Sequence, residues 1–112
     1  MIRLFIADEQ PVVLAGLRSF FSGTEFQVVG EASSGLDLLG GVERACPHLV
    51  LIDTSQTSFQ GFSEGFCKHS RWEYKLVDYS PALKAVSKQT LLEALRKSAP
   101  KRIGAHGKTI AS

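Results

Sequence analysis

The sequence predicts an α/β domain built on a parallel β-sheet. Three short apolar segments have the character of buried strands, and they alternate with two segments in which apolar residues recur at helical spacing, a pattern typical of this fold class. The chain has 112 residues, of which 44% are hydrophobic and 21% are charged. This length suits one domain with one core, and this composition is that of a folded globular protein rather than a disordered one.

The first strand and helix are predicted between Ile2 and Phe21. The segment Ile2–Ala7 is a nearly continuous apolar run that ends in acids, as expected for a strand buried on both faces of a sheet. Pro11 can begin a helix because its missing N–H is not needed in the first turn. Apolar residues then follow at helical spacing until Gly23, which ends the helix.

A second strand and helix follow, and then a third strand. The segment Phe26–Glu31 is the second predicted strand, and Ser34 with Asp37 forms a capping box for a helix that ends before Pro47. The segment His48–Asp53 contains another unbroken apolar run and again finishes on a carboxylate. The first half of the chain therefore predicts three strands and two helices in alternation.

The second half has a weaker pattern. Residues 61–69 are only loosely helical, and Tyr74–Tyr79 is a mixed strand. Ser87 is a good N-cap for a helix over 88–98, whose last turn carries the basic residues that favour a helix C-terminus. Residues 100–112 are basic and broken by Pro and Gly, so we predict a domain over residues 1–99 and a tail or linker over residues 100–112.

Charge and composition exclude several classes of function. The net charge is +2 with acids and bases mixed along the chain, so we expect no direct DNA binding. The two cysteines form no CxxC motif, which argues against a zinc or disulfide framework. The apolar run at the N-terminus is too short for a signal sequence or a membrane span, so we expect a cytoplasmic protein without membrane contact.

Asp8, Glu9 and Asp53 stand at the carboxyl ends of predicted strands, where ligands bind in parallel sheets. If the first and third strands are neighbours, as in the flavodoxin-like order, their ends are about 4.8 Å apart and the three carboxylates share one crevice. Such an oxygen-rich pocket suits Mg²⁺, and Asp53 could act as the nucleophile in phosphoryl transfer. The alternative is that these acids only cap helices or face solvent.

These residues carry a resemblance to a known family. The first half of the chain, in the stretches IRLFIADEQPVVLAGLRSFF, FQVVGEASSG and PHLVLID, resembles a response-regulator receiver domain of the type attached to helix-turn-helix transcription factors. The resemblance implies a flavodoxin-like parallel sheet with helices on both faces. It assigns Asp53 as phosphoryl acceptor, Asp8, Glu9 and Asp53 as ligands of Mg²⁺ together with the backbone carbonyl of Ser55, and Gly61 as the family's glycine beyond the acceptor.

The resemblance also implies partners. A histidine kinase or a phosphotransfer protein would supply the phosphoryl group, a homodimer is expected, and DNA would be contacted only through an output domain that this sequence does not contain. The loop after the acceptor departs from the family, because Gln56 and Thr57 replace the usual Met-Pro pair.

The C-terminal part resembles the family's final strand and helix in the stretch ALKAVSKQTLLEALRKSA, which assigns Lys84 as the family's lysine. Lys84 comes 31 positions after Asp53, although a single βαβ unit already needs about 30 residues. We therefore predict that one strand–helix unit after the third strand is missing or remodelled. The alternative interpretation of Lys84 is a solvated side chain before a helix.

A competing alignment takes Tyr74–Tyr79 as the fourth strand and Ser80 as the switch hydroxyl. It makes the helix over 88–98 the fourth helix and leaves Lys101, Arg102 or Lys108 as the cation. We prefer the alignment with Lys84, because its match extends through the helix.

Three functions remain as hypotheses. The first is a receiver domain that accepts a phosphoryl group on Asp53, and the second is a pseudo-receiver that acts by dimerisation or protein interaction without phosphorylation. The third is a phosphatase with Asp8 as nucleophile, which needs a second aspartate where this chain has Gln10. We therefore expect that the protein is not an enzyme.

Overall fold

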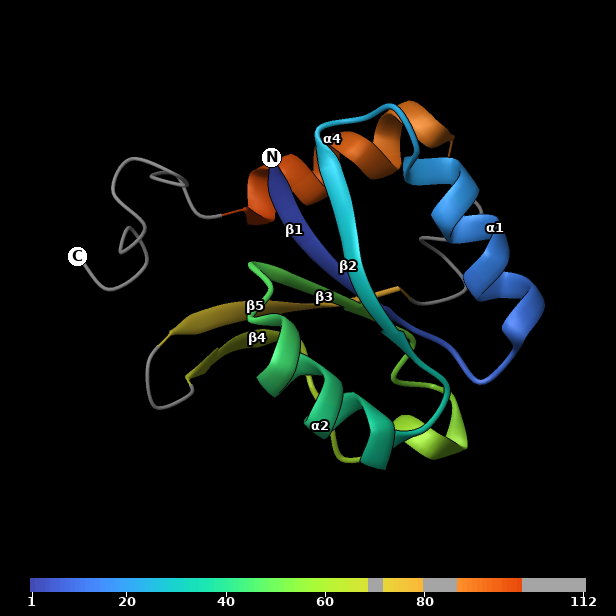
Figure 1. Ribbon diagram of the computed structural model, residues 1–112, viewed down its shortest axis with the longest axis vertical. Coiled ribbons are helices and arrows are strands. Elements are labelled where there is room, and N and C mark those ends of the chain that lie inside the picture. Colours follow the sequence, from blue (N-terminus) through green and yellow to red (C-terminus); the bar gives the residue numbers. More distant parts are fainter. Residues whose placement is uncertain (69–71, 80–86, 100–112) are drawn as a thin grey trace.

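The computed structural model describes residues 1–68, 72–79 and 87–99 (Figure 1). Within them, five strands form one sheet in the order β2-β1-β3-β5-β4. The strands are β1 (Ile2–Ala7), β2 (Phe26–Ala32), β3 (Leu49–Ile52), β4 (Gly65–Lys68) and β5 (Glu73–Asp78). The helices are α1 (Pro11–Phe21), α2 (Gly35–Ala45) and α4 (Lys88–Ser98), and a single 3-10 turn, η1, spans Thr57–Phe59.

The sheet is mostly parallel, as the sequence predicts. Strand β1 pairs in parallel with both β2 and β3, and β3 pairs in parallel with β5. The order β2-β1-β3 is the beginning of the flavodoxin-like order, with the first strand between the second and the third. The predicted fold class, a flavodoxin-like parallel sheet, is therefore confirmed.

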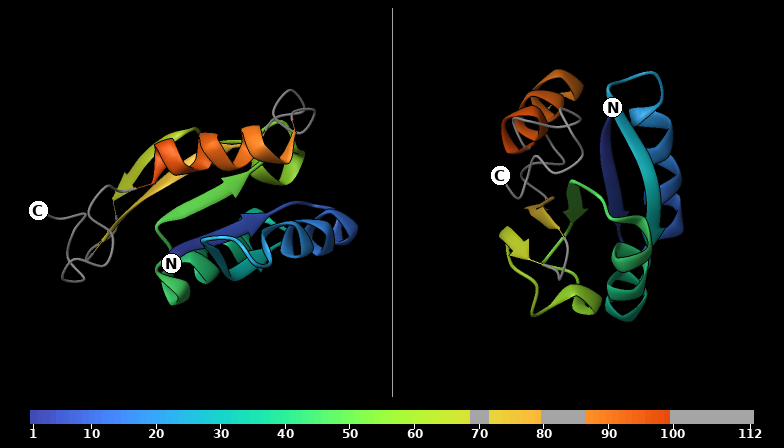
Figure 2. Two further views of the ribbon diagram at one scale, coloured as in Figure 1. Left: turned by 90° about the horizontal axis from the view of Figure 1, so that it is seen from above. Right: turned by 60° about the vertical axis from the view of Figure 1, so that its left-hand side comes forward.

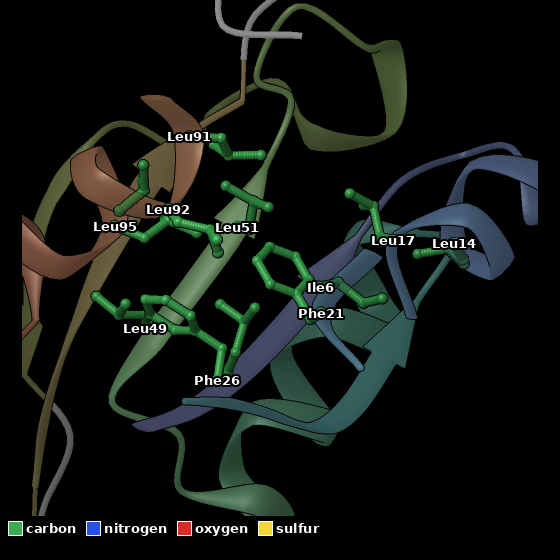
Figure 3. Close-up of a cluster of buried hydrophobic side chains, with 12 residues drawn as sticks. Ile6, Leu14, Leu17, Phe21, Phe26, Leu49, Leu51, Leu91, Leu92 and Leu95 are labelled. Carbon is green, nitrogen blue, oxygen red and sulfur yellow. The ribbon is translucent and has the colours of Figure 1, made fainter. Parts of the chain in front are cut away.

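Helices cover both faces of the sheet. Successive residues of a buried strand point to opposite faces, so Leu4 and Ile6 join one hydrophobic cluster while Phe5 and Ala7 join another. The first cluster is completed by α1 and α4, through Leu14, Leu17, Leu91, Leu92 and Leu95. Figure 3 shows the leucines of α4 beside Leu51 of β3, while those of α1 lie on the side of Ile6. The second cluster is completed by α2 and η1, through Leu38, Val42 and Phe59.

The helix ends follow the predicted sequence signals. Helix α1 begins at Pro11, and the Ser34 hydroxyl caps α2 by accepting a hydrogen bond from the Asp37 N–H at 3.2 Å. Ser87 caps α4 in the same way, with the Thr90 N–H as donor at 3.2 Å. Helix α2 ends at Ala45, and the left-handed φ of 47° at the next residue, Cys46, turns the chain toward the third strand.

The segment after β3 differs from the prediction. Residues 65–68 of the loosely helical stretch form the edge strand β4, which pairs antiparallel with β5. The exposure of its side chains alternates with period two, since Phe66 and Lys68 face solvent while Cys67 is half-buried opposite Tyr74. This segment is too short for its own apolar pattern to specify a strand, so its conformation is determined by the pairing with β5.

Strand β5 takes the place beside β3, and the predicted strand over Tyr74–Tyr79 is confirmed with bounds one residue earlier. Among the described residues between β3 and β5 there is a 3-10 turn and an edge strand but no α-helix. The predicted remodelling of one strand–helix unit is therefore seen in this segment.

The predicted helix over 88–98 is confirmed by α4, which lies along β5 (Figure 2) and packs on the same face of the sheet as α1. An exposed ion pair between Arg96 and Glu25 joins α4 to the start of β2. Within the described ranges, none of the helices has the length and apolar character needed to span a bilayer. The predicted tail over 100–112 lies outside the described residues.

Candidate functional site

Two buried carboxylates end neighbouring strands. Ala7 of β1 and Ile52 of β3 are paired in register, and Asp8 and Asp53 directly follow them. Asp8 has no exposed surface and Asp53 is 2% exposed. The condition set by the sequence, that the first and third strands are neighbours, is therefore met, and these two acids lie at the same edge of the sheet.

Asp8 is held by donors from its own turn and from the loop after β3. Its Oδ1 accepts hydrogen bonds from the Gln10 N–H at 2.9 Å and from Nε2 of Gln56 at 3.1 Å. Its backbone N–H donates to the carbonyl of Ala32 at 3.0 Å, which anchors the turn to β2. The side chain is thus fixed where the chain leaves β1 for α1.

Glu9 is bound to the loop formed by residues 54–60, which we call the acceptor loop. Its backbone N–H donates to Oε1 of Gln56 at 3.0 Å, and its Oε2 accepts a hydrogen bond from the Ser58 N–H at 2.6 Å. Both the backbone and the carboxylate of Glu9 therefore contact the acceptor loop.

Asp53 begins this loop and is held by Ser55. Its Oδ1 accepts hydrogen bonds from the N–H of Ser55 at 3.0 Å and from the Ser55 hydroxyl at 2.6 Å. The carbonyl of Asp53 accepts from the Gln56 N–H at 3.2 Å, which closes a tight turn directly after β3. This turn brings the Gln56 side chain back over Asp8 and Glu9, which we call the acidic pair.

Asp78 is a fourth acid at this edge, which the sequence analysis missed. It ends β5, in register with Ile52, and its carboxylate accepts both the N–H of Thr54 at 3.1 Å and the Thr54 hydroxyl at 2.8 Å. Its own N–H donates to Oε1 of Glu64 at 3.0 Å. The signal that could have found it was available, because Asp78 is an acid near the end of a predicted strand, as Asp8 and Asp53 are.

The described residues contain no group of three Asp, Glu, His or Cys side chains arranged to hold a metal ion. The expected crevice of three carboxylates is not assembled, and the Glu9 carboxylate is bonded to Ser58 instead. Mg²⁺, however, is usually held by only one or two carboxylates together with water and phosphate oxygens. Asp8 and Asp53 supply two buried carboxylates at one edge, so the residues present are compatible with Mg²⁺.

Of the other predicted site residues, the structure describes Gly61 but not Lys84 or Ser80. Gly61 follows the acceptor loop with a φ of 96°, a conformation that favours glycine. Lys84 and Ser80 lie outside the described residues, as do the alternative cations Lys101, Arg102 and Lys108.

No protein-family model matches the chain. Over 61 residues it is 43% identical to the uncharacterized transcriptional regulatory protein YhcZ of Bacillus subtilis (strain 168), a match that covers 54% of this chain and 28% of that protein. The chain thus spans less than a third of this curated relative.

Two solved structures of RcsB are also similar. The first is the isolated REC domain of RcsB from Salmonella enterica serovar Typhimurium with the phosphomimetic BeF3−, at 27% identity and a TM-score of 0.48, covering 55% of this chain and 46% of that one. The second is the Salmonella typhimurium RcsB response regulator, at 20% identity and a TM-score of 0.46, covering 86% of this chain and 36% of that one.

The order of the first three strands, the buried acids at the ends of β1 and β3, and the similarity to a transcriptional regulatory protein agree with the motifs of the sequence. The chain resembles a response-regulator receiver domain.

Proposed function

We propose that this chain is a receiver module that accepts a phosphoryl group on Asp53 from a histidine kinase or a phosphotransfer protein. The observation that carries the proposal is the buried Asp53 at the end of β3, beside the buried Asp8 at the end of the neighbouring strand. Since the curated relative is a transcriptional regulatory protein, we further propose a role in transcription regulation through an output domain.

In the proposed reaction, a carboxylate oxygen of Asp53 attacks phosphorus, and an O–P bond forms as the N–P bond to the donor histidine breaks. The bonding electron pair goes to the imidazole nitrogen, and the product on the receiver is an acyl phosphate. Asp8 and Asp53, with the Ser55 carbonyl that the resemblance assigns, would hold Mg²⁺, which when bound neutralises charge on the transferring phosphoryl group. By resemblance, Lys84 would add a second positive charge.

The contacts of Asp53 support this proposal. Ser55 donates twice to Oδ1 of Asp53, which fixes the plane of the carboxylate. Thr54, the residue directly after Asp53, is anchored to β5 through Asp78. The two residues that follow Asp53 are therefore both held by hydrogen bonds, and fixed orientation is a large part of catalysis in phosphoryl transfer.

Phosphorylation can be tested with a small phosphodonor. Incubating the protein with acetyl phosphate and MgCl2 should increase its intact mass by one phosphoryl group, and the same treatment in EDTA should not. Asp53→Asn keeps the shape of the side chain but removes the nucleophile, so this variant should stay unmodified. An unmodified wild-type protein, or equal modification of Asp53→Asn, contradicts the proposal.

A pseudo-receiver that acts by dimerisation or partner binding is the second candidate. The observation that favours it is the remodelled segment between β3 and β5, which contains an edge strand in place of a strand–helix unit among the described residues. Sedimentation with and without beryllofluoride and Mg²⁺ separates the two candidates. A homodimer that forms only with beryllofluoride supports the receiver, and a dimer that is unchanged by it supports the pseudo-receiver.

A further inference from the structure

The Gln56 side chain connects the acceptor loop to the acidic pair, at a position where the family usually has methionine. Its Nε2 donates to Oδ1 of Asp8 at 3.1 Å, and its Oε1 accepts from the Glu9 N–H at 3.0 Å. The orientation of the amide is fixed by chemistry, because only its oxygen can accept from the Glu9 N–H, and the NH2 group must then face Asp8. A methionine could not donate to Asp8, and its thioether sulfur is only a weak acceptor for the Glu9 N–H.

These contacts place hydrogen-bond donors of the protein against the acidic site. Asp8 and Asp53 are buried carboxylates at adjoining strand ends, and buried charges require donors or a cation. The Gln56 amide places positively polarised hydrogens against Asp8, and Ser58 places its N–H against the Glu9 carboxylate. The acceptor loop thus supplies to Asp8 and Glu9 a part of the positive charge that a metal ion would supply.

We infer that Gln56 sets the affinity of this site for Mg²⁺, because its amide takes part of the cation's role in the metal-free protein and must be released when the metal binds. This inference rests on the proposed function. A divalent cation coordinated by Asp8 brings positive charge against the amide hydrogens of Gln56, so the two compete for the same carboxylate. Metal binding must then break this hydrogen bond, and the free energy lost with it lowers the net affinity for the metal.

The sign of the effect follows from this competition. Removing a hydrogen bond that exists only in the metal-free form destabilises that form alone, so Mg²⁺ binds more tightly. If the hydrogen bond persisted in the metal-bound form, its removal would destabilise both forms equally and the dissociation constant would not change. The dissociation constant therefore separates a residue that competes with the metal from one with a purely structural role.

The test compares Gln56→Met with Gln60→Met, a matched change at an exposed glutamine of the same loop. Gln56→Met should melt at a lower temperature in EDTA than the wild type, and should bind MgCl2 about tenfold more tightly by calorimetry, the scale of one hydrogen bond to a charged group. Gln60→Met should change neither quantity. In the wild type, the Nε2 resonances of Gln56 should move toward those of exposed amides as MgCl2 is added.

A wild-type dissociation constant in Gln56→Met, or weaker binding, overturns the inference. If Gln56→Met does not fold, Gln56→Ala replaces it with the same expected and contradicting results. The outcomes also separate the inference from the proposed function. Wild-type protein that binds Mg²⁺ and accepts a phosphoryl group, with an unchanged Gln56→Met affinity, refutes the inference alone, whereas wild-type protein that does neither refutes both.

Discussion

The ring of Phe5 packs closely against two glycines, and this contact provides a quantitative test of how α2 is attached to the sheet. A Cβ atom added to Gly41 of α2 would lie 2.6 Å from Cζ and 2.9 Å from Cε2 of the Phe5 ring. A Cβ added to Gly30 of β2 would lie 2.7 Å from Cε2 of the same ring. Phe5 is 1% exposed, so the ring is enclosed by the core and has little room to move away from an added methyl group.

We predict that Gly41→Ala destabilises the protein although alanine favours helix formation. Overpacking a core costs about 1–3 kcal/mol, and replacing a helical glycine by alanine returns about 1 kcal/mol, so the net loss is up to about 2 kcal/mol. At about 4 °C per kcal/mol for a domain of this size, the melting temperature should fall by up to about 8 °C.

The adjacent glycine is a matched control in the same helix. A Cβ added to Gly40 would approach only the flexible end of Arg44, so Gly40→Ala should raise the melting temperature by up to about 4 °C. In a Phe5→Leu background, where the side chain is smaller, Gly41→Ala should cost less than in the wild type, a coupling that a double-mutant cycle measures. Equal effects of Gly40→Ala and Gly41→Ala in calorimetric melting would refute this account of the packing.

Three further predictions concern the acceptor loop, the pKa of His48 and the pKa of Tyr74. Thr54→Val removes the hydroxyl donor to Asp78 and should lower the stability measured by urea unfolding by about 1–2 kcal/mol; an unchanged midpoint contradicts this. Burial lowers the pKa of His48 from its usual 6.5, so the unfolded chain binds a proton at a higher pH than the folded protein does. The free energy of unfolding should therefore fall as the pH falls below 6.5. An NMR titration of the folded protein should give a midpoint for His48 below that value. Burial raises the pKa of Tyr74 from 10.0 to about 12, so stability should fall as the pH rises above 10, and Tyr74→Phe should remove the late step in tyrosinate absorbance.

The first half of the fold could be predicted from the sequence because its signals are local and agree with one another. The first and third strands contain the unbroken apolar runs Leu4–Ala7 and Leu49–Ile52, and they become β1 and β3 at the centre of the sheet. Pro11 and Ser34 mark the starts of α1 and α2, where backbone donors need no partner or obtain one from a side chain.

The hairpin of β4 and β5 could not be predicted in the same way. Phe59, Phe62 and Phe66 recur at intervals of three and four, which is the spacing of a helix face. The structure separates them, since Phe59 is fully buried in η1 while Phe66 is 67% exposed on β4. Strand β4 has only four residues, and its conformation depends on pairing with β5, a tertiary contact that local spacing does not contain.

The candidate site, too, could be predicted from the sequence only in part. Asp8 and Asp53 could be placed together because strand ends in a parallel sheet share one edge. The role of Gln56 could not be predicted, since its partners are 47 and 48 positions away and the contact depends on how the turn after β3 folds back. A residue that departs from a family motif is visible in the sequence, but its contacts are visible only in the structure.

The α2 side of the sheet explains how the domain keeps a core without an α-helix in the described residues between β3 and β5. Phe59 of η1 is fully buried there, and Phe62, Trp72 and Tyr74 pack partly buried against the same cluster. Aromatic side chains bury large areas from short segments, so a turn and a hairpin can cover a face that a crossover helix would otherwise cover.

The packing of Phe59 also restrains the acceptor loop. Because Phe59 anchors the end of the loop in the core, and Asp53 begins it at the end of β3, the loop is fixed at both ends while Gln56 and Ser58 hold its middle to the acidic pair. The release of the Gln56 amide that we infer would therefore be a local change of a few residues rather than an opening of the domain. Two hydrogen bonds between Thr54 and Asp78 join this loop to β5, so the strand that pairs with β4 is in direct contact with the loop that follows Asp53.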